Sequence, residues 1–446
     1  MRAIALIALL FLTACATVGD TAQGQSGARW VTSWGASIQG PYPIGNPSAM
    51  PDQSRVFPVP AGGTPGARDQ SFRLIVRPTL WGRETRIRMS NALGTKPVTF
   101  DGVHVGLQNA GAEITAGTNR AVTFGGKNSV TVAPGQSVWS DAVTLPFVRD
   151  ASAIELAGRK LAVSFHVVGE SGPMTWHAKA LQSSYVTWPG AGAKGHEEAE
   201  ASFPFATAAW FFVDALDMRA GDDAYAVVAF GDSITDGMAS TMNGDDRWPD
   251  VLDRRLRAAY GNRVAVVNAG IGGNQVVGPT VYPPPKPCPG GPSALSRLER
   301  DVLTLSGVKA VIWLEGTNDF SRNGNASVEA VTKGMREGVA RMRERLPGVR
   351  VIGATVVSAL GATSAAHGFK EQDDKRRQLN EFIHSSGVFD GVADFDKVVT
   401  DAQTGAMRVE FVPDNTVGGP GDKLHPNRLG YQAMGAVIDL KLLAPR

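Results

Sequence analysis

In the second half of the chain, short apolar runs alternate with longer helical patterns, and this alternation limits the fold more than any other feature. Strand–helix alternation of this kind builds a parallel sheet covered by helices on both faces, so we predict a three-layer α/β domain of about five strands over residues 221–446. The expected strands are 226–230, 264–268, 308–314, 351–357 and, more weakly, 392–395. The expected helices are 247–260, 293–305, 327–346, 369–385 and 428–440.

Residues 29–220 have a different pattern, in which many short segments alternate between apolar and polar side chains. Examples are 72–77 and 85–89, and turn pairs such as Gly172-Pro173 separate the segments. Short strands with turns between them are typical of a β-sandwich. Because a chain of 446 residues is too long for one typical core, we place the boundary between an all-β domain and the α/β domain in the segment 217–224.

Residues 1–28 have the features of an export signal followed by a tether. Arg2 precedes an apolar run, 3–12, that is too short to span a bilayer. Leu12-Thr13-Ala14-Cys15 resembles the lipobox of bacterial lipoproteins, in which the cysteine is lipidated, whereas Ala14-Cys15-Ala16 also fits the cleavage site of an ordinary secretory signal. We favour the lipoprotein, which predicts a periplasmic or cell-surface protein held to the membrane through Cys15. The alternative is a soluble secreted protein.

The stretch 226–237 places a serine where a buried strand ends and a helix begins. The apolar run ends at Gly231, and Asp232, Ser233 and Thr235 are residue types that favour turns and helix N-caps. Open α/β sheets bind ligands at this edge, and unpaired N–H groups at a helix start can stabilise an anion. Ser233 is therefore a candidate nucleophile, and a simple strand-to-helix cap is the alternative. Asp232 is expected to shape the turn.

Three further polar clusters follow later strands or lie in the last loop: 268–274, 316–319 and 422–426. A parallel sheet would bring all of them to the edge that carries the serine. His425 can take a serine proton near neutral pH, and Asp422, three residues earlier, can fix its tautomer. The N–H of a glycine and the amide of an asparagine can donate hydrogen bonds to an oxyanion.

Other ligands are possible at these clusters, but the spacing argues against them. The dinucleotide fingerprint fails in the segment 270–275, because its third glycine would fall at Gln275. The segment 231–235 lacks the lysine of a phosphate loop, and no second histidine lies at metal-ligand spacing from His425. We therefore expect no cofactor and no metal. The formal net charge of +2 gives no reason to expect a nucleic-acid partner.

Taken in this order, the four clusters resemble the SGNH hydrolases, also called the GDSL esterase family. The resemblance implies a flavodoxin-like sheet and ester hydrolysis through an acyl-enzyme, with Ile234 standing where the family usually has leucine. It assigns catalytic roles to Ser233, Asp422 and His425, and an oxyanion hole to Ser233, Gly273 and Asn318. In the first half, 30–34 and 86–91 are similar to the β-domain of bacterial two-domain esterases, some of which are associated with xylan degradation.

Export, nine tryptophans and the added β-domain favour acetyl groups on polysaccharide as the substrate. Tryptophans stack on sugars, but we expect most of them to fill cores. The expected function is therefore a short-chain (acetyl) esterase acting on carbohydrate or aryl esters. A lipid or lysophospholipid esterase and a non-catalytic glycan-binding lipoprotein are the alternatives. The sequence does not determine the oligomeric state.

Overall fold

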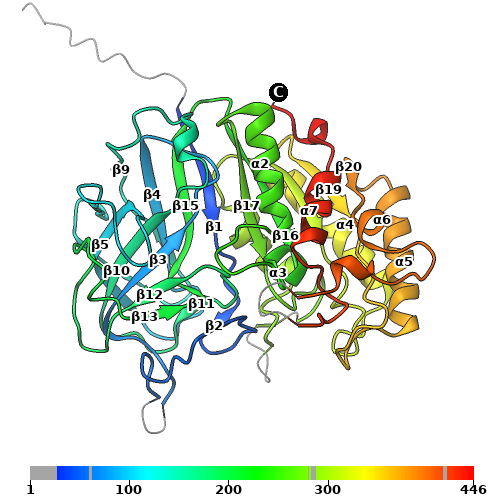
Figure 1. Cartoon of the computed structure of the whole chain (residues 1–446), viewed down its shortest axis with the longest axis horizontal. Coiled ribbons are helices and arrows are strands. Elements are labelled where there is room, and N and C mark those ends of the chain that lie inside the picture. The colour runs from blue at the N-terminus through cyan, green and yellow to red at the C-terminus, as the bar shows by residue number, and fades with distance from the viewer. Residues whose placement is uncertain (1–27, 60–62, 280, 283–287, 415–418, 446) are drawn as a thin grey trace, which may run out of the picture.

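A computed structural model describes residues 28–59, 63–279, 281–282, 288–414 and 419–445. The predicted export segment, including Cys15, lies outside the described residues. Figure 1 shows an all-β half, coloured from blue to green, beside a half in which helices surround a central sheet. In the part of the chain that is described, no helix is long and apolar enough to cross a membrane.

The second half is built on a parallel sheet whose strands are linked by helices, as the sequence predicts. The strand order is β17–β16–β18–β19–β20, and every neighbouring pair is parallel. This flavodoxin-like order reverses beside β16, and ligands bind at such a point in open α/β sheets. The strands are β16 Tyr225–Gly231, β17 Val264–Gly270, β18 Val308–Leu314, β19 Arg350–Ala354 and β20 Gly391–Ala393.

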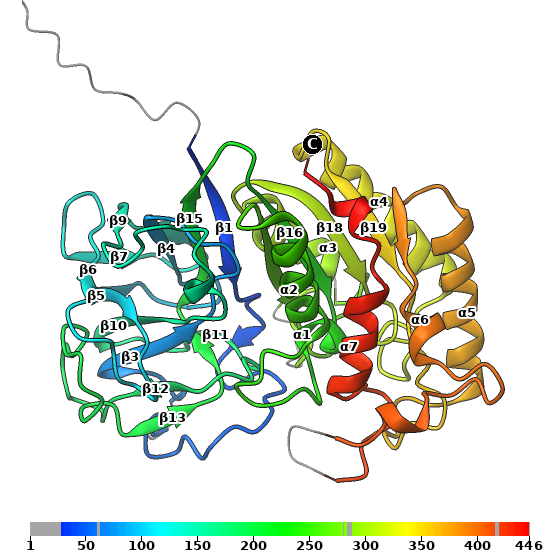
Figure 2. The same ribbon diagram turned by 45° about the horizontal axis from the view of Figure 1, so that its top comes forward.

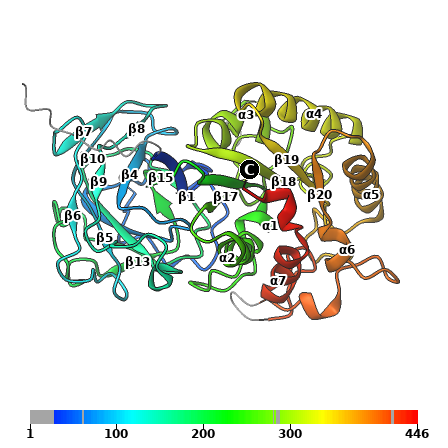
Figure 3. The same ribbon diagram turned by 90° about the horizontal axis from the view of Figure 1, so that it is seen from above.

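Helices cover both faces of this sheet, and Figure 3 shows α3 and α4 on one side of it and α2 and α7 on the other. Alternate residues of β16 point to opposite faces, so Val227 and Ala229 pack with α2 and α7, whereas Val228 and Phe230 pack with α4 and α5. The helices are α1 Ser233–Asp236, α2 Trp248–Tyr260, α3 Ala294–Leu298, α4 Val328–Arg345, α5 Lys370–Ser385, α6 Phe395–Val399 and α7 Arg428–Val437.

The predicted helix 293–305 is divided in the structure. Helix α3 gives way to a π-helical turn, Glu299–Leu303. Asp301 in this turn accepts hydrogen bonds from Arg297 at 3.0 Å and from Arg300 at 2.6 Å. The wider turn therefore brings two arginines to one buried carboxylate.

The predicted strand 351–357 is shorter than expected, because β19 ends at Ala354. The N–H of Val356 donates to Oδ1 of Asn380 in α5 at 2.8 Å instead of to a neighbouring strand. Val356 and Val357 are buried all the same. The apolar run 351–357 therefore predicts correctly that this segment is buried, but it does not predict where the strand ends.

The first half is an all-β sandwich of antiparallel sheets, as predicted. One sheet contains β1 Arg29–Gly35, β15 Val213–Ala220, β4 Glu84–Ser90, β8 Ser137–Trp139 and β9 Val143–Thr144. The larger sheet contains β13 Phe205–Thr207, β12 Ser184–Val186, β3 Arg68–Val76, β10 Leu161–Glu170, β5 Val98–Leu107, β6 Arg120–Ala121 and β7 Ser129–Val132. A small third sheet contains β14 Trp210–Phe211, β11 Thr175–His177 and β2 Gly40–Pro41.

Most tryptophans fill cores, as expected. The buried ones are Trp34, Trp81, Trp176, Trp210, Trp248 and Trp313. Trp188, by contrast, is 52% exposed and lies edge-on against Phe205. Tryptophan content by itself is therefore weak support for a glycan surface.

The two halves meet along β1 and β17, which lie side by side in Figure 3. Figure 2 shows β1 on the side of the all-β half that faces the α/β half. The hydroxyl of Thr79 accepts a hydrogen bond from the N–H of Val266 on the edge strand β17 at 3.0 Å. Gly35 passes so close that a Cβ there would lie 2.8 Å from Cγ1 of Val267. The β half therefore covers the free edge of the parallel sheet, beside the carboxyl ends of the strands.

Candidate active site

Ser233 is the first residue of helix α1, directly after the carboxyl end of β16. Asp232 caps this helix, because its Oδ1 accepts a hydrogen bond from the N–H of Ile234 at 2.9 Å. The strand ends at Gly231, where a Cβ would lie 2.3 Å from Oγ1 of Thr235. The glycine thus allows the sharp turn that brings the serine hydroxyl to the edge of the sheet.

Ser233, His425 and Asp422 form a continuous hydrogen-bonded chain. Ser233 Oγ lies 2.8 Å from Nε2 of His425, and Nδ1 of His425 lies 2.6 Å from Oδ2 of Asp422. Oδ1 of Asp422 also accepts from the N–H groups of Leu424 and His425, both at 2.9 Å. Asp422 therefore holds the imidazole with its hydrogen on Nδ1, which leaves the Nε2 lone pair for the serine hydroxyl.

Asp422 is held in its ionised form by this arrangement. Partial burial raises the pKa of the carboxyl, but the hydrogen bonds from His425 and Leu424 and the charge of His425 outweigh it, so the pKa lies well below its ordinary value. A carboxylate at this place can stabilise a positively charged imidazole during a proton transfer.

The other two predicted residues, Gly273 and Asn318, lie together in the turns that follow β17 and β18. Asn318 Nδ2 donates to the carbonyl of Asn274 at 3.0 Å and keeps a second N–H. Gly273 has a φ of +85°, a conformation that favours glycine. Among the described residues, no protein group accepts from the N–H of Gly273 or from that of Ser233. Three hydrogen-bond donors therefore remain available to an oxyanion.

Comparison with known proteins agrees with this geometry. The model of the GDSL-like lipase/acylhydrolase family matches residues 229–433. The α/β half of the chain belongs to this family. The protein is therefore an ester hydrolase of the GDSL type. No curated protein matches the chain.

Several solved structures of GDSL-type and other esterases are similar to about half of this chain. A carbohydrate acetylesterase from Sinorhizobium meliloti is 15% identical, with a TM-score of 0.36 over 47% of this chain and 94% of that one. An aryl esterase from M. smegmatis is 19% identical, with a TM-score of 0.36 over 48% and 95% of the two chains. A lipase/acylhydrolase from Enterococcus faecalis is 24% identical, with a TM-score of 0.34 over 48% and 92%.

Arg297 of the GDSL domain is a structural residue that the sequence did not single out. Its side chain is fully buried and donates to the carbonyls of Gly231 and Ala269 and to Oδ1 of Asn274, each at 2.8 Å. These contacts tie the ends of β16 and β17 to the turn 271–274. One arginine in a helical pattern is too common a signal for its role to be read from the sequence.

Three carboxyl groups in the segments that follow β16 and β18 are buried: Asp232, Glu315 and Asp319. Burial first, and then repulsion by the charge of Glu315, raise the pKa of Asp232 to about 8 and that of Asp319 to about 7. Asp319 accepts from the N–H groups of the segment 276–277 at 2.8 and 3.1 Å, so it orders the chain that follows the turn 271–274.

His367 adds a neutral imidazole close to His425. Oε1 of Gln372 accepts from the N–H of Gly368, and Nε2 of Gln372 donates to the carbonyl of Thr317 at 3.0 Å and to Nδ1 of His367 at 2.9 Å. The hydrogen of the ring therefore lies on Nε2. Burial, and then the charge of His425, lower the pKa of His367 to about 4, which keeps the ring neutral at physiological pH.

The β half reaches this site through His177, which the sequence also did not single out. His177 Nδ1 lies 2.7 Å from the carbonyl of Ser37, and its Nε2 lies 3.1 Å from Oδ1 of Asp236 in α1. Oδ2 of Asp236 accepts from the N–H of Gly272 at 2.9 Å. The β half thus contacts both helix α1 and the turn 271–274.

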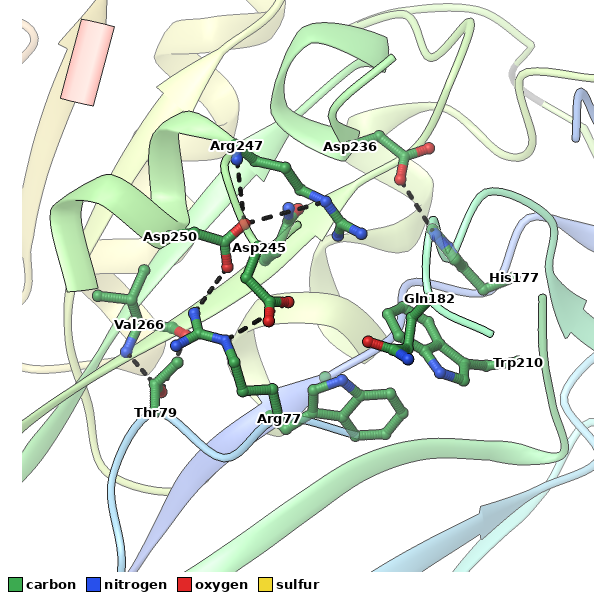
Figure 4. Close-up of a pocket in the computed structure, with 13 residues that line it drawn as sticks. Arg77, Thr79, His177, Gln182, Trp210, Asp236, Asp245, Arg247, Asp250 and Val266 are labelled. Carbon is green, nitrogen blue, oxygen red and sulfur yellow. Dashed lines mark hydrogen bonds and ion pairs between the residues drawn. The ribbon is translucent and has the colours of Figure 1, made fainter. Parts of the chain in front are cut away.

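Figure 4 shows His177 and Asp236 facing each other at a pocket between the two halves. Arg77 from the β half meets Asp245 and Asp250 on the opposite side of this pocket. Ser233 and His425 are not among its lining residues. The charged groups of the pocket are mostly paired with one another, and the pairs of His177 and Arg77 join the two halves. The pocket is therefore part of the domain interface. Among the described residues, no group of side chains is arranged to hold a metal ion.

Proposed function

We propose that the protein is a serine esterase that hydrolyses carboxylic esters through an acyl-enzyme on Ser233. The observation that carries this proposal is the hydrogen-bonded chain from Ser233 Oγ to His425 (2.8 Å) and on to Asp422 (2.6 Å). His425 takes the hydroxyl proton as Oγ attacks the carbonyl carbon, and Asp422 stabilises the imidazolium that forms. His425 then gives the proton to the departing alcohol oxygen as the ester C–O bond breaks.

The negative charge on the carbonyl oxygen in this step needs hydrogen-bond donors. The N–H groups of Ser233 and Gly273 and the free Nδ2–H of Asn318 are proposed to supply them, and each such donor is worth about 10²–10³ in kcat. A water molecule then loses a proton to His425 and attacks the acyl carbon. The acid leaves, and the Ser233 hydroxyl is restored.

We infer that the acyl group is short, with acetyl esters of carbohydrates or aryl alcohols as substrates. Export and the added β half favour acetyl groups on polysaccharide, as the sequence predicts. A lipid ester is the second candidate.

The test is hydrolysis of p-nitrophenyl esters from acetate to palmitate by a form that lacks residues 1–28. We expect rapid turnover of the shortest esters, no turnover by Ser233→Ala, and labelling of Ser233 by a fluorophosphonate probe. Ser152→Ala, an exposed serine of the β half, is the matched control and should keep full activity and labelling.

Each result in this assay separates the candidate functions. A preference for long chains would favour a lipid esterase. Equal rates for Ser233→Ala and the native protein would remove Ser233 from the mechanism. Failure of every ester, together with no probe labelling and a glycan affinity that Ser233→Ala leaves unchanged, would favour a non-catalytic binding protein.

We also propose that the enzyme is exported and held to a membrane by a lipid on Cys15, as the lipobox-like tetrapeptide 12–15 predicts. Metabolic labelling with palmitate should mark the native protein and not Cys15→Ala, and the variant should leave the membrane fraction. An unlabelled native protein would favour an ordinary secretory signal.

A further inference from the structure

One side chain of the β half lies directly on the turn that carries the oxyanion glycine. A Cβ added at Gly272 would lie 2.6 Å from Oδ1 and 2.9 Å from Nδ2 of Asn46, and one added at Gly273 would lie 3.3 Å from Nδ2. The Asn46 amide is therefore in contact with the backbone of both glycines. It comes from a loop more than 220 residues earlier in the chain.

The orientation of this amide follows from Gln39, which is fully buried. Oε1 of Gln39 accepts from the N–H of Ala178 at 3.2 Å, and its Nε2 donates to the carbonyl of Pro289 at 2.7 Å. Nε2 of Gln39 also lies 2.6 Å from Asn46, so the Asn46 atom at this contact is the acceptor Oδ1. Asn46 Nδ2 is then the atom that lies 2.9 Å from a Cβ added at Gly272 and 3.3 Å from one added at Gly273.

Lys179 fixes the backbone of the same loop. Its side chain is buried, and Nζ donates to the carbonyl of Asn46 at 2.8 Å and to the hydroxyl of Ser48 at 2.6 Å. Cε of Lys179 would also lie 3.0 Å from a Cβ at Gly272. The loop is thus anchored on both sides, and the Asn46 amide is held in place before any substrate arrives.

Nδ2 of Asn46 has no hydrogen-bond acceptor among the described residues. Asn46 is half-buried, and its Nδ2 is not one of the fully buried polar atoms. A rigid, accessible donor beside an oxyanion turn is well suited to bind an oxygen atom of the substrate. The turn itself uses the backbone N–H of Gly273 for the ester carbonyl in the proposed mechanism.

We propose that Asn46 is a substrate-binding residue supplied by the β half, and that its Nδ2 donates to a hydroxyl next to the ester on a polyol such as a sugar. This inference rests on the proposed function, because it takes the ester carbonyl to lie at Gly273. The alcohol oxygen is bonded to the same carbonyl carbon, so a hydroxyl on the neighbouring carbon comes within reach of Asn46. An aryl ester such as p-nitrophenyl acetate has no such hydroxyl.

The experiment compares kcat/KM of native enzyme and Asn46→Ala on two substrates. One is a monoacetylated methyl glycoside with a free hydroxyl beside the acetate, and the other is p-nitrophenyl acetate. We expect the variant to lose about tenfold or more on the sugar ester, the worth of one hydrogen bond, and to change less than about threefold on the aryl ester. The deoxy analogue of the sugar ester should be insensitive to the substitution.

Two further variants keep the test decisive if Asn46→Ala is poorly folded. Asn46→Asp retains the shape and the acceptor for Gln39 but lacks the donor, so it should show the same selective loss. Asn109→Ala, an exposed asparagine of the β half that bonds only Glu113, should behave as native enzyme. Fluorophosphonate labelling of Ser233 confirms that each variant has an intact catalytic centre.

Equal losses on both substrates, or no loss on either, would overturn the role of Asn46 while leaving Ser233 as the nucleophile. Activity that survives in Ser233→Ala would instead overturn the proposed function. The two failures are distinguishable. The role of Asn46 is measured by how much the substitution changes the ratio of kcat/KM between the two substrates, whereas Ser233 controls turnover of both substrates.

Discussion

Asp232, the residue before the nucleophile, caps helix α1 and is also a buried acid. Its side chain accepts from the N–H of Ile234, yet burial and the charge of Glu315 raise its pKa from 3.8 to about 8. Between these two pH values the folded protein holds a proton that the unfolded chain releases. Stability contributed by this group is therefore greatest at low pH and falls as the pH rises towards 8.

Asp232→Asn should remove this pH dependence. The amide Oδ1 can still accept from Ile234, but it cannot ionise, so the variant should gain stability relative to native protein as the pH rises from 5 to 8. The gain is at most about 1.4 kcal/mol for each pH unit. Chemical denaturation across this pH range measures it.

Asp374→Asn is the matched control, because Asp374 is an exposed carboxylate paired with Lys370. Its difference from native protein should vary little with pH, since exposed ion pairs contribute little. A constant difference between Asp232→Asn and native protein across the same range would show that Asp232 ionises normally in the fold.

The sequence identified the site residues whose partners lie close to them along the chain. Asp422 and His425 are three positions apart, and their contact at 2.6 Å follows from that spacing once the loop is in place. Asn46 and Arg297 have no such signal. Their partners lie on other elements, and an asparagine or arginine at one position is compatible with many surfaces, so only the tertiary structure shows what each contacts.

At the scale of elements, the β half holds helix α1, which carries Ser233, and the turn 271–274 together as one unit. His177 Nδ1 faces a carbonyl, which can only accept, so Nδ1 carries a hydrogen. Nε2 lies 3.1 Å from Oδ1 of Asp236. Asp236 in turn orients Gly272 through its other oxygen.

His177→Ala should therefore lower kcat by about tenfold or more with little change in KM, because a small displacement of the oxyanion turn weakens transition-state binding more than substrate binding. Steady-state kinetics on p-nitrophenyl acetate measures both constants. His177→Gln should recover part of kcat, since the Gln amide can donate to Asp236.

The control for this pair is His384→Ala, a half-exposed histidine on α5. It should leave kcat unchanged. If His177→Gln proves no better than His177→Ala, or if both variants change KM alone, the His177–Asp236 contact does not position the turn.

The arrangement of elements could be predicted better than their ends. Alternation of apolar runs and helical patterns predicted the parallel sheet and its covering helices, because both are set by burial. The end of β19 and the division of helix 293–305 depend on Asn380 and Asp301, which act through side-chain contacts that periodicity does not contain.

At the scale of the whole molecule, the two halves share one hydrophobic core. Phe72 and Phe165 of the sandwich belong to the same buried cluster as Phe230, Met335 and other residues from one face of the α/β sheet. Apolar side chains that are buried between the two halves become exposed to water when either half unfolds. Both halves then lose the stabilisation that this burial provides. We therefore expect the two halves to unfold as a single cooperative unit.

The polar part of the interface offers the sharpest test of this cooperativity. Arg77 of the β half lies 2.7 Å from Asp250 and 2.8 Å from Asp253 of helix α2, and all three side chains are largely shielded from solvent. Arg77→Ala removes the cation that lies between these two buried carboxylates, and breaking such a buried pair costs about 3–5 kcal/mol. Amide hydrogen exchange should then accelerate in core peptides of both halves, including β10 and β18.

Arg219→Ala provides the comparison, because Arg219 forms an exposed ion pair with Glu84 within the β half. It should leave exchange in both cores almost unchanged. Faster exchange confined to α2 in Arg77→Ala would mean that the halves open separately, and the β half would then be a docked accessory. Faster exchange in both cores would make the sandwich part of the folding unit of the esterase, as expected if it supplies side chains to the ester site.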